Sequence, residues 1–151
     1  MPHSYTNLLY HIVFSTKDRR PLIDETLCSR LYEYLGGTIR GLDGIALEIG
    51  GIADHVHLLV KLRQDHAVSA VLRDLKANSS GWVNQRELIV TQSFAWQTGY
   101  GAFTVSESQV EKVKQYIRNQ EAHHHKTTFQ DEFVALLRAH GIEYDSEHLW
   151  K

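Results

Sequence analysis

The sequence has little cysteine, no long apolar run and no strong excess of charge. Cys28 is the only cysteine among 151 residues, which excludes a disulfide framework within the chain and a zinc site built from several thiolates. No apolar stretch approaches the roughly 20 residues that cross a bilayer, and the first residues lack the charged flank and apolar core of a signal peptide. We therefore expect a soluble, cytoplasmic protein with no membrane partner.

The balance of charge is nearly even, with a formal net charge of −2 and an isoelectric point near 6.5. Any affinity for nucleic acid must therefore come from a local basic surface and not from the molecule as a whole. Repeats, linkers and low-complexity segments are also missing, and the length suits one compact domain. We expect residues 1–151 to form a single domain.

The spacing of apolar residues predicts the order strand, helix, strand, strand, helix, strand, followed by two more helices. The strands are expected at residues 5–15, 45–49, 54–62 and 94–105, the last of them irregular, and the helices at residues 24–41, 68–82, 108–122 and 128–141. The first six elements are typical of the ferredoxin-like, or split βαβ, arrangement. The expected fold class is thus α+β, an antiparallel sheet with helices on one face plus two C-terminal helices.

Local signals mark several of the predicted boundaries. Asp24 is a helix N-cap candidate, and Ser108 with Glu111 forms a capping-box pattern. Thr128, three residues before an aspartate, is expected to cap the last helix. Gly50-Gly51 is expected to break the chain between the second and third strands.

His55 and His57 stand two residues apart on the third predicted strand. Because side chains alternate between the faces of a strand, both imidazoles project to the same side, close enough to share one ion. Two imidazoles on an apolar strand are costly unless they are hydrogen-bonded, exposed or liganded. The tripeptide alone leaves two interpretations open, a metal-binding pair or two histidines facing solvent.

Tyr116 and Gln120 are four residues apart on a predicted helix and share one of its faces. A phenol is a poor nucleophile at its usual pKa, but a metal that polarises the electrophile and a group that takes the proton make it useful. Gln120 would offer a neutral carbonyl oxygen to an ion held by the two histidines. Such neutral ligands leave the cation's double charge facing a phosphate, whereas an acidic ligand would bind it more tightly and blunt that charge. The alternative is a tyrosine at the edge of the core beside an exposed glutamine.

His55-x-His57, followed by Tyr116 in a Tyr-Ile-x-x-Gln context, resembles the HUH-type single-tyrosine transposases. These include the TnpA-like enzymes of bacterial insertion sequences and the REP-associated tyrosine transposases. Further segments similar to the family's are HIVFSTK at residues 11–17, GGIADHVH at 50–57 and WQTGY at 96–100. The resemblance runs from the first strand to about Gln120.

The resemblance implies a metal-dependent endonuclease and transposase that nicks single-stranded DNA, in particular hairpin-bearing DNA. Tyr116 would attack a phosphodiester and leave a 5′-phosphotyrosine and a free 3′-hydroxyl, while His55, His57 and Gln120 would hold a divalent metal. Magnesium is expected, with manganese able to substitute. In TnpA-like enzymes the tyrosine helix serves the histidine pair of the partner subunit, so the resemblance also implies a homodimer with shared active sites.

Several other residues are candidates for DNA contacts, with solvated surface or core packing as the alternative. The basic candidates are Lys17, Arg19, Arg20, Arg73, Lys76, Lys112 and Arg118. The aromatic candidates for stacking on bases are Trp96, Tyr100 and Phe103. His123-His124-His125 is expected to be solvated at a helix C-terminus, and His11 to be a satisfied core or interface histidine.

Two other functions remain open from the sequence. A non-catalytic module would bind single-stranded nucleic acid on its ferredoxin-like sheet, as RNA-binding domains do, and its binding would survive a chelator and the loss of His55. A metal-dependent hydrolase of small phosphodiesters would use water in place of Tyr116 as the nucleophile and form no covalent intermediate.

Overall fold

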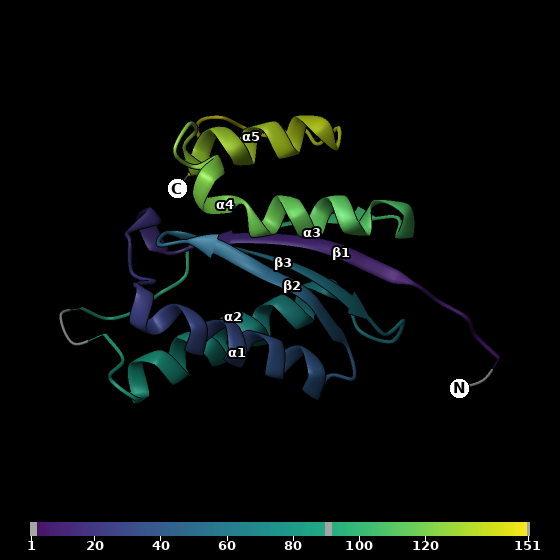
Figure 1. Ribbon diagram of the computed structural model, residues 1–151, viewed down its shortest axis with the longest axis horizontal. Helices are drawn as coiled ribbons and strands as arrows, with labels where there is room; N and C mark the ends of the chain where they lie inside the picture. Colours follow the sequence, from purple (N-terminus) through teal and green to yellow (C-terminus); the bar gives the residue numbers. More distant parts are fainter. Residues whose placement is uncertain (1–2, 90–91, 151) are drawn as a thin grey trace.

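One antiparallel sheet organises the computed structural model, which describes residues 3–89 and 92–150 (Figure 1). Its strands are β1 (Leu8–Ser15), β2 (Ile45–Ile52), β3 (His55–Leu62) and β4 (Gly101–Val105). They lie in the order β2-β3-β1-β4, and each neighbouring pair is antiparallel. This order, with a helix after β1 and another after β3, confirms the predicted ferredoxin-like α+β fold.

Helices α1 (Glu25–Gly41) and α2 (Val68–Gln85) cover one face of the sheet (Figure 1). Asp24 caps α1 as predicted, because its carboxylate accepts the backbone N–H of Leu27 at 2.8 Å. The strands alternate, so one set of their side chains meets these two helices and forms the main core. Its central members are Ile12, Phe14, Val56, Leu58, Val60, Leu31, Leu35 and Leu72.

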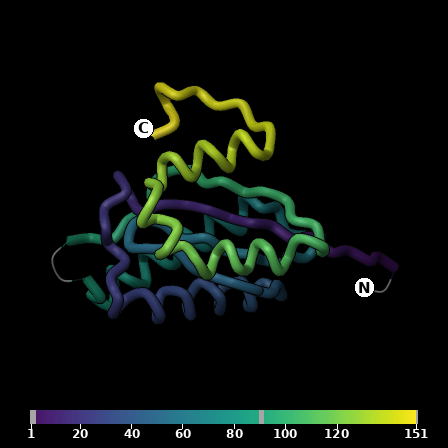
Figure 2. Tube along the Cα trace, turned by 45° about the horizontal axis from the view of Figure 1, so that its top comes forward, coloured from purple at the N-terminus to yellow at the C-terminus, as the bar shows by residue number. Residues whose placement is uncertain are grey.

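The opposite face of the sheet carries α3 (Val110–Arg118), α4 (Gln120–His123) and α5 (Phe129–Ala139) (Figure 1). Two small apolar clusters attach this layer to the sheet. One contains Leu9, Leu59, Val110 and Ile117, and the other contains Val13, Phe103, Phe129 and Leu137. After α5 the chain turns back along that helix (Figure 2), and Trp150 packs against Phe129 and Phe133.

The glycine pair in β2 does not break the strand, which corrects the sequence-based expectation. β2 continues through Gly50-Gly51 to Ile52, and the turn lies at residues 53–54. A Cβ atom built on Gly50 would lie 2.6 Å from the carbonyl oxygen of Ile117 in α3. The glycine is there because α3 approaches the sheet closely, and not because the chain reverses.

Two other predicted boundaries are wrong, and both lie near α3. The capping box does not form, because Ser108 lies in a short 3-10 turn and its hydroxyl pairs with that of Ser106. The predicted helix 108–122 is interrupted at Asn119, between α3 and α4. The cap of α5 is confirmed, since the hydroxyl of Thr128 accepts the backbone N–H of Asp131.

The predicted strand 94–105 is regular only from Gly101 onward. Its first half is irregular because a side chain takes the backbone groups of Phe94 and only an isolated bridge joins the segment to the end of β1. The amide group of Asn84 accepts from the backbone N–H of Phe94 and donates to its carbonyl oxygen, while Trp96 forms an isolated bridge with Thr16. Among the described residues, no helix combines the length and apolar character needed to cross a bilayer.

Candidate active site

His55 and His57 project from β3 toward the layer that contains α3, α4 and α5. Their ring centroids lie 5.0 Å apart, and both side chains are fully buried. The alternation of side chains along β3 puts them on one face, as predicted, while Val56 enters the main core on the other. Complete burial contradicts the interpretation in which the pair faces solvent.

Each imidazole is held at its Nδ1 atom, so that Nε2 points into the space between the sheet and the helices. His55 Nδ1 lies 2.7 Å from a carboxylate oxygen of Asp54, which can only accept. His57 Nδ1 lies 2.8 Å from His11 Nε2. Burial, with His57 nearby, lowers the pKa of His11 to about 3, so His11 is neutral, and the tautomers of the two rings decide which of them donates this hydrogen bond. Outer partners of this kind fix the tautomer of metal-binding histidines.

Tyr116 and Gln120 reach the same space from the helical layer. Gln120 Oε1 lies 3.0 Å from His55 Nε2, and Gln120 is buried, which contradicts the exposed alternative. The Tyr116 ring lies edge-on to His57, with centroids 5.6 Å apart. The four residues singled out in the sequence therefore meet within one chain.

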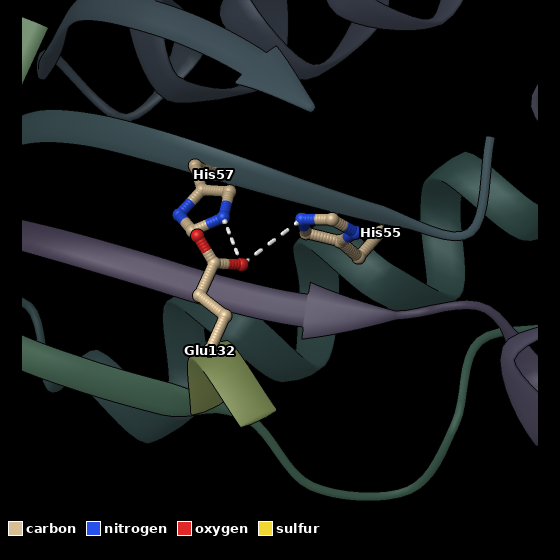
Figure 3. A group of neighbouring side chains, drawn as sticks. All are labelled: His55, His57 and Glu132. Carbon is tan, nitrogen blue, oxygen red and sulfur yellow. Dashed lines mark hydrogen bonds and ion pairs between the residues drawn. The ribbon is translucent and has the colours of Figure 1, made fainter. Parts of the chain in front are cut away.

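The side chain that joins them, Glu132 of α5, was missed by the sequence analysis. Figure 3 shows its carboxylate directed between His55 and His57. Its Oε1 atom lies 3.3 Å from His55 Nε2 and 3.2 Å from His57 Nε2. Its Oε2 atom accepts hydrogen bonds from the Tyr116 hydroxyl and, at 2.9 Å, from Gln120 Nε2.

One signal in the sequence could have indicated Glu132. It follows Phe129 by three residues, so an acid stands on the apolar face of a predicted amphipathic helix. A carboxylate therefore lies among the side chains from which the sequence predicts only neutral ligands, and the ligand set itself stays a prediction.

The charges within the cluster depend on one another. Burial by itself lowers the pKa of His55, but hydrogen bonds to Asp54, Glu132 and Gln120 outweigh it and raise that pKa to about 9. Burial likewise opposes ionisation of Glu132, but hydrogen bonds from His55 and His57 hold its pKa well below the usual range. Burial lowers the pKa of His57 to about 4. These side chains thus hold an ionised Glu132 beside a protonated His55.

The Tyr116 hydroxyl keeps its proton in this environment. Burial, and then its hydrogen bond to the ionised Glu132, raises its pKa above the ordinary value near 10. Deprotonation of the phenol therefore requires an acceptor or a nearby positive charge.

His124 also turns inward, which corrects the prediction for the histidine triplet. Its Nδ1 donates to the carbonyl oxygen of Thr127 at 2.8 Å, and its Nε2 lies 3.0 Å from both Gln120 Oε1 and Glu132 Oε1. Only 4% of this side chain is exposed. His125 is exposed, as expected for the solvated end of a helix.

These residues fit a divalent cation. The two strand histidines and Glu132 present ligand atoms that all lie within 4.8 Å of one another. Imidazole nitrogen with carboxylate and amide oxygen is a donor set that divalent metals use in proteins.

Comparison with known proteins places the chain in a family. The sequence matches the family model described as "Transposase IS200 like" over residues 4–120. The chain belongs to the IS200-like transposase family. The matched segment contains both histidines, Tyr116 and Gln120, whereas His124 and Glu132 lie beyond its end. A search of curated proteins finds no match.

Two solved structures share the fold of this IS200-like transposase. A candidate transposase from Deinococcus radiodurans R1 has a TM-score of 0.66 and 23% identity, over 80% of this chain and 95% of that one. A REP-associated tyrosine transposase bound to a REP hairpin has a TM-score of 0.62 and 14% identity, over 82% of this chain and 73% of that one.

The predicted DNA-contact residues of the transposase differ in their surroundings. Lys112 lines, with Tyr116, a surface pocket of about 250 Å³. Lys76 donates to the carbonyl oxygens of Gln97 and Gly99, and thereby holds that loop. The other five basic residues are exposed or partly exposed. Arg118 pairs with Glu48, Arg73 with Asp74, and Arg20 with the side chain of Gln92. Arg19 lies over the Trp150 ring, and Lys17 lies in the turn after β1. Their contacts with DNA stay a prediction.

The aromatic candidates for base stacking belong largely to the core of the transposase. Trp96 packs edge-on against Phe14, and its indole N–H donates to the Ser79 hydroxyl at 2.9 Å. Phe103 is buried in the cluster beside α5. Tyr100 is 39% exposed and remains a candidate.

Proposed function

We propose that this IS200-like transposase nicks and transfers single-stranded DNA through a covalent bond between Tyr116 and a 5′-phosphate. The observation that carries the proposal is the position of the Tyr116 hydroxyl, which donates to a carboxylate that also contacts His55 and His57. Nucleophile, proton acceptor and candidate metal ligands are therefore adjacent. The structural neighbour bound to a REP hairpin supports hairpin-bearing DNA as the substrate class.

In the chemical step one O–P bond forms as another breaks, and the proton lost by the phenol balances the proton gained by the leaving 3′-oxygen. The Tyr116 oxygen attacks the phosphorus of a phosphodiester, so an O–P bond forms to tyrosine while the bond from phosphorus to the 3′-oxygen breaks. The departing 3′-oxygen takes a proton from water, and the phenolic proton passes to Glu132, which already accepts it in a hydrogen bond. Attack by the free 3′-hydroxyl of another strand on the phosphotyrosine reverses the chemistry and completes transfer.

His55, His57 and Gln120 would hold a divalent cation beside the scissile phosphate. When bound, such a cation supplies positive charge that stabilises the charge developing on the phosphate oxygens. Asp54 and His11 orient the two histidines for this role from the outer side. The identity of the metal, expected from the sequence to be magnesium with manganese as a substitute, stays a prediction.

The arrangement of the layers favours catalysis over simple binding on the sheet. RNA-binding domains of ferredoxin-like fold use an open sheet face to stack bases. Here α1 and α2 cover one face, and α3, α4 and α5 cover the other (Figure 1). A non-catalytic module of that kind would need a different surface.

The test is formation of a covalent adduct. Purified protein is incubated with single-stranded oligonucleotides that carry imperfect palindromes from the DNA flanking its coding region, with Mg²⁺ or Mn²⁺, and is run on a denaturing gel. We expect a protein–DNA adduct that Tyr116→Phe abolishes, while the same change at the 92%-exposed Tyr5 leaves it intact. An undiminished adduct in Tyr116→Phe would remove this tyrosine from the mechanism. DNA binding that ignores EDTA and His55→Ala, without any adduct, would favour the non-catalytic module.

A further inference from the structure

We propose that a cavity beside the histidine pair binds one unpaired nucleobase of the DNA strand, near the phosphodiester that Tyr116 would attack. The cavity has a volume of about 180 Å³. Its aromatic walls are Tyr100, Phe129, Phe133 and Trp150. Three of these four residues lie beyond the segment that matches the family, so the cavity belongs largely to the C-terminal part of this chain. The inference rests on the proposed function for its substrate, single-stranded DNA.

The cavity adjoins the histidine pair on the same face of the sheet. Val13 and Ser15 of β1 line it. In the sheet register these two residues lie directly opposite His57 and His55, and residues opposite one another share a face. Phe129 forms another wall, and its ring lies against the ring of His55, with centroids 4.4 Å apart. One aromatic ring therefore separates the cavity from His55, so a base held there would belong to a nucleotide close to the scissile phosphate.

The walls of the cavity suit a flat ring. Phe129, Phe133 and Trp150 lie around one another, with ring centroids 5.6 to 6.0 Å apart. Tyr100 adds a fourth ring at the surface. Every base has a flat face that can stack on such rings. The volume is below the roughly 300–1,000 Å³ of pockets for drug-sized ligands, so the cavity suits a single base and not a larger ligand.

The loop at the rim of the cavity is held in place and presents a polar group. Lys76 donates to the carbonyl oxygens of Gln97 and Gly99, and the backbone N–H of Gln97 donates to the carbonyl oxygen of Ser15 at 2.9 Å. The side-chain oxygen of Gln97 accepts the backbone N–H of Asp18 at 2.8 Å. Its amide N–H group makes no hydrogen bond within the described part of the chain, so it can donate to the edge of a base.

A basic turn beside the cavity favours a base that is attached to a phosphate backbone over a neutral aromatic ligand. The guanidinium of Arg19 lies over the Trp150 ring, 5.2 Å from its centroid. Its Nη1 atom is buried and has no hydrogen-bond partner among residues 3–89 and 92–150. A buried N–H group needs an acceptor, and a phosphate oxygen is one that guanidinium groups bind well. Lys17 and Arg20 of the same turn are exposed and add positive charge.

Binding of DNA that lacks single bases tests the inference apart from cleavage. The probe is the palindrome-bearing oligonucleotide of the adduct assay, in which an abasic site replaces one unpaired nucleotide at a time. Affinity is measured by fluorescence anisotropy with EDTA present. We expect the wild type to lose about 10-fold or more in affinity when the base at one position is missing. Trp150→Ala should weaken binding of the intact oligonucleotide by a similar factor and show no further loss at that position.

The matched control is Trp82→Ala, at a half-buried tryptophan of α2 in the layer on the other face of the sheet. This variant should keep both the affinity of the wild type and its sensitivity to the missing base. Tyr100→Ala is a second variant of the cavity, at an exposed residue, and should lose the same sensitivity as Trp150→Ala does.

Photocrosslinking of the unaltered protein protects the test against a variant that fails to fold. With 5-iodouracil at the sensitive position, ultraviolet light should join the DNA to Tyr100 or Trp150, as identified by mass spectrometry of the peptides. Crosslinks to other segments only, equal tolerance of abasic sites at every position, no binding of any probe, or undiminished sensitivity to the missing base in folded Trp150→Ala would overturn the inference. The expected crosslink without a Tyr116–DNA adduct would keep the nucleobase site and reject the proposed transferase, whereas an adduct with evenly tolerated abasic sites would do the reverse.

Discussion

His55 and His57 owe their orientation to side chains outside the two-histidine motif. Asp54 stands next to His55 in the chain, whereas His11 comes from the neighbouring strand β1. Each holds an Nδ1 atom, and this is what turns the two Nε2 atoms toward the helices. At the scale of single residues, the site therefore depends on its outer partners as much as on its candidate ligands.

Replacing Asp54 with alanine tests this dependence. Without its carboxylate, the His55 ring loses the acceptor that fixes its tautomer, so we expect the affinity for Mn²⁺ to fall by about 10- to 100-fold. The same loss should appear as a higher Mn²⁺ concentration for half-maximal adduct formation. Asp74→Ala, at an exposed position on α2, is the control. Metal affinity that is equal in the two variants would contradict a positioning role for Asp54.

At the scale of elements, the approach of α3 to β2 places Tyr116 over the histidine pair. Ile117, the next residue, packs with Leu59 of β3, and its carbonyl oxygen lies against Gly50. A side chain at position 50 would therefore push α3 away from the sheet and carry Tyr116 with it.

Gly50→Ala tests the need for this close approach. Its methyl group would meet the carbonyl oxygen of Ile117 at 2.6 Å, and overpacking of this kind costs about 1–3 kcal/mol. We expect a lower free energy of unfolding in urea and slower adduct formation. Gly81→Ala is the matched control, since a Cβ there meets nothing within 4 Å and alanine favours a helix by up to about 1 kcal/mol. A stable and fully active Gly50→Ala protein would show that α3 tolerates displacement.

At the scale of the whole molecule, one chain brings Tyr116 to its own histidine pair. The resemblance to TnpA-like enzymes instead predicts a homodimer in which α3 serves the partner's site, and that dimer stays a prediction. The two arrangements differ in which chain supplies the nucleophile, and not in the chemistry.

Mixing two inactive variants distinguishes a site formed within one chain from a site shared between subunits. Tyr116→Phe keeps the histidines, whereas His57→Ala keeps the tyrosine. If the site forms within one chain, as its geometry favours, the mixture should remain as inactive as either variant alone in the adduct assay. Recovery of adduct on the His57→Ala chain would show that active sites are shared between subunits. The double variant, in which one chain carries both Tyr116→Phe and His57→Ala, is the control for background cleavage.

The sequence by itself determined the order of the elements and four of the residues at the site. Period-two alternation puts His55 and His57 on one face of a strand, and spacing by four puts Tyr116 and Gln120 on one side of a helix. These relations are local, so they hold wherever the two elements are packed. The ferredoxin-like arrangement was predicted from the order of the elements, and the observed strand order β2-β3-β1-β4 confirms it.

Only the tertiary structure decided what lies between those elements. Glu132 enters the site because α5 folds back over the sheet (Figure 3), and His124 enters it from the end of α4. Local periodicity carries no information about which helix meets which strand. Gly50 was read as a turn because its real constraint, the backbone of α3, is 67 residues away in the chain. The charge of the site therefore comes from contacts distant in sequence, whereas the histidine pair and the pairing of Tyr116 with Gln120 are encoded by neighbours.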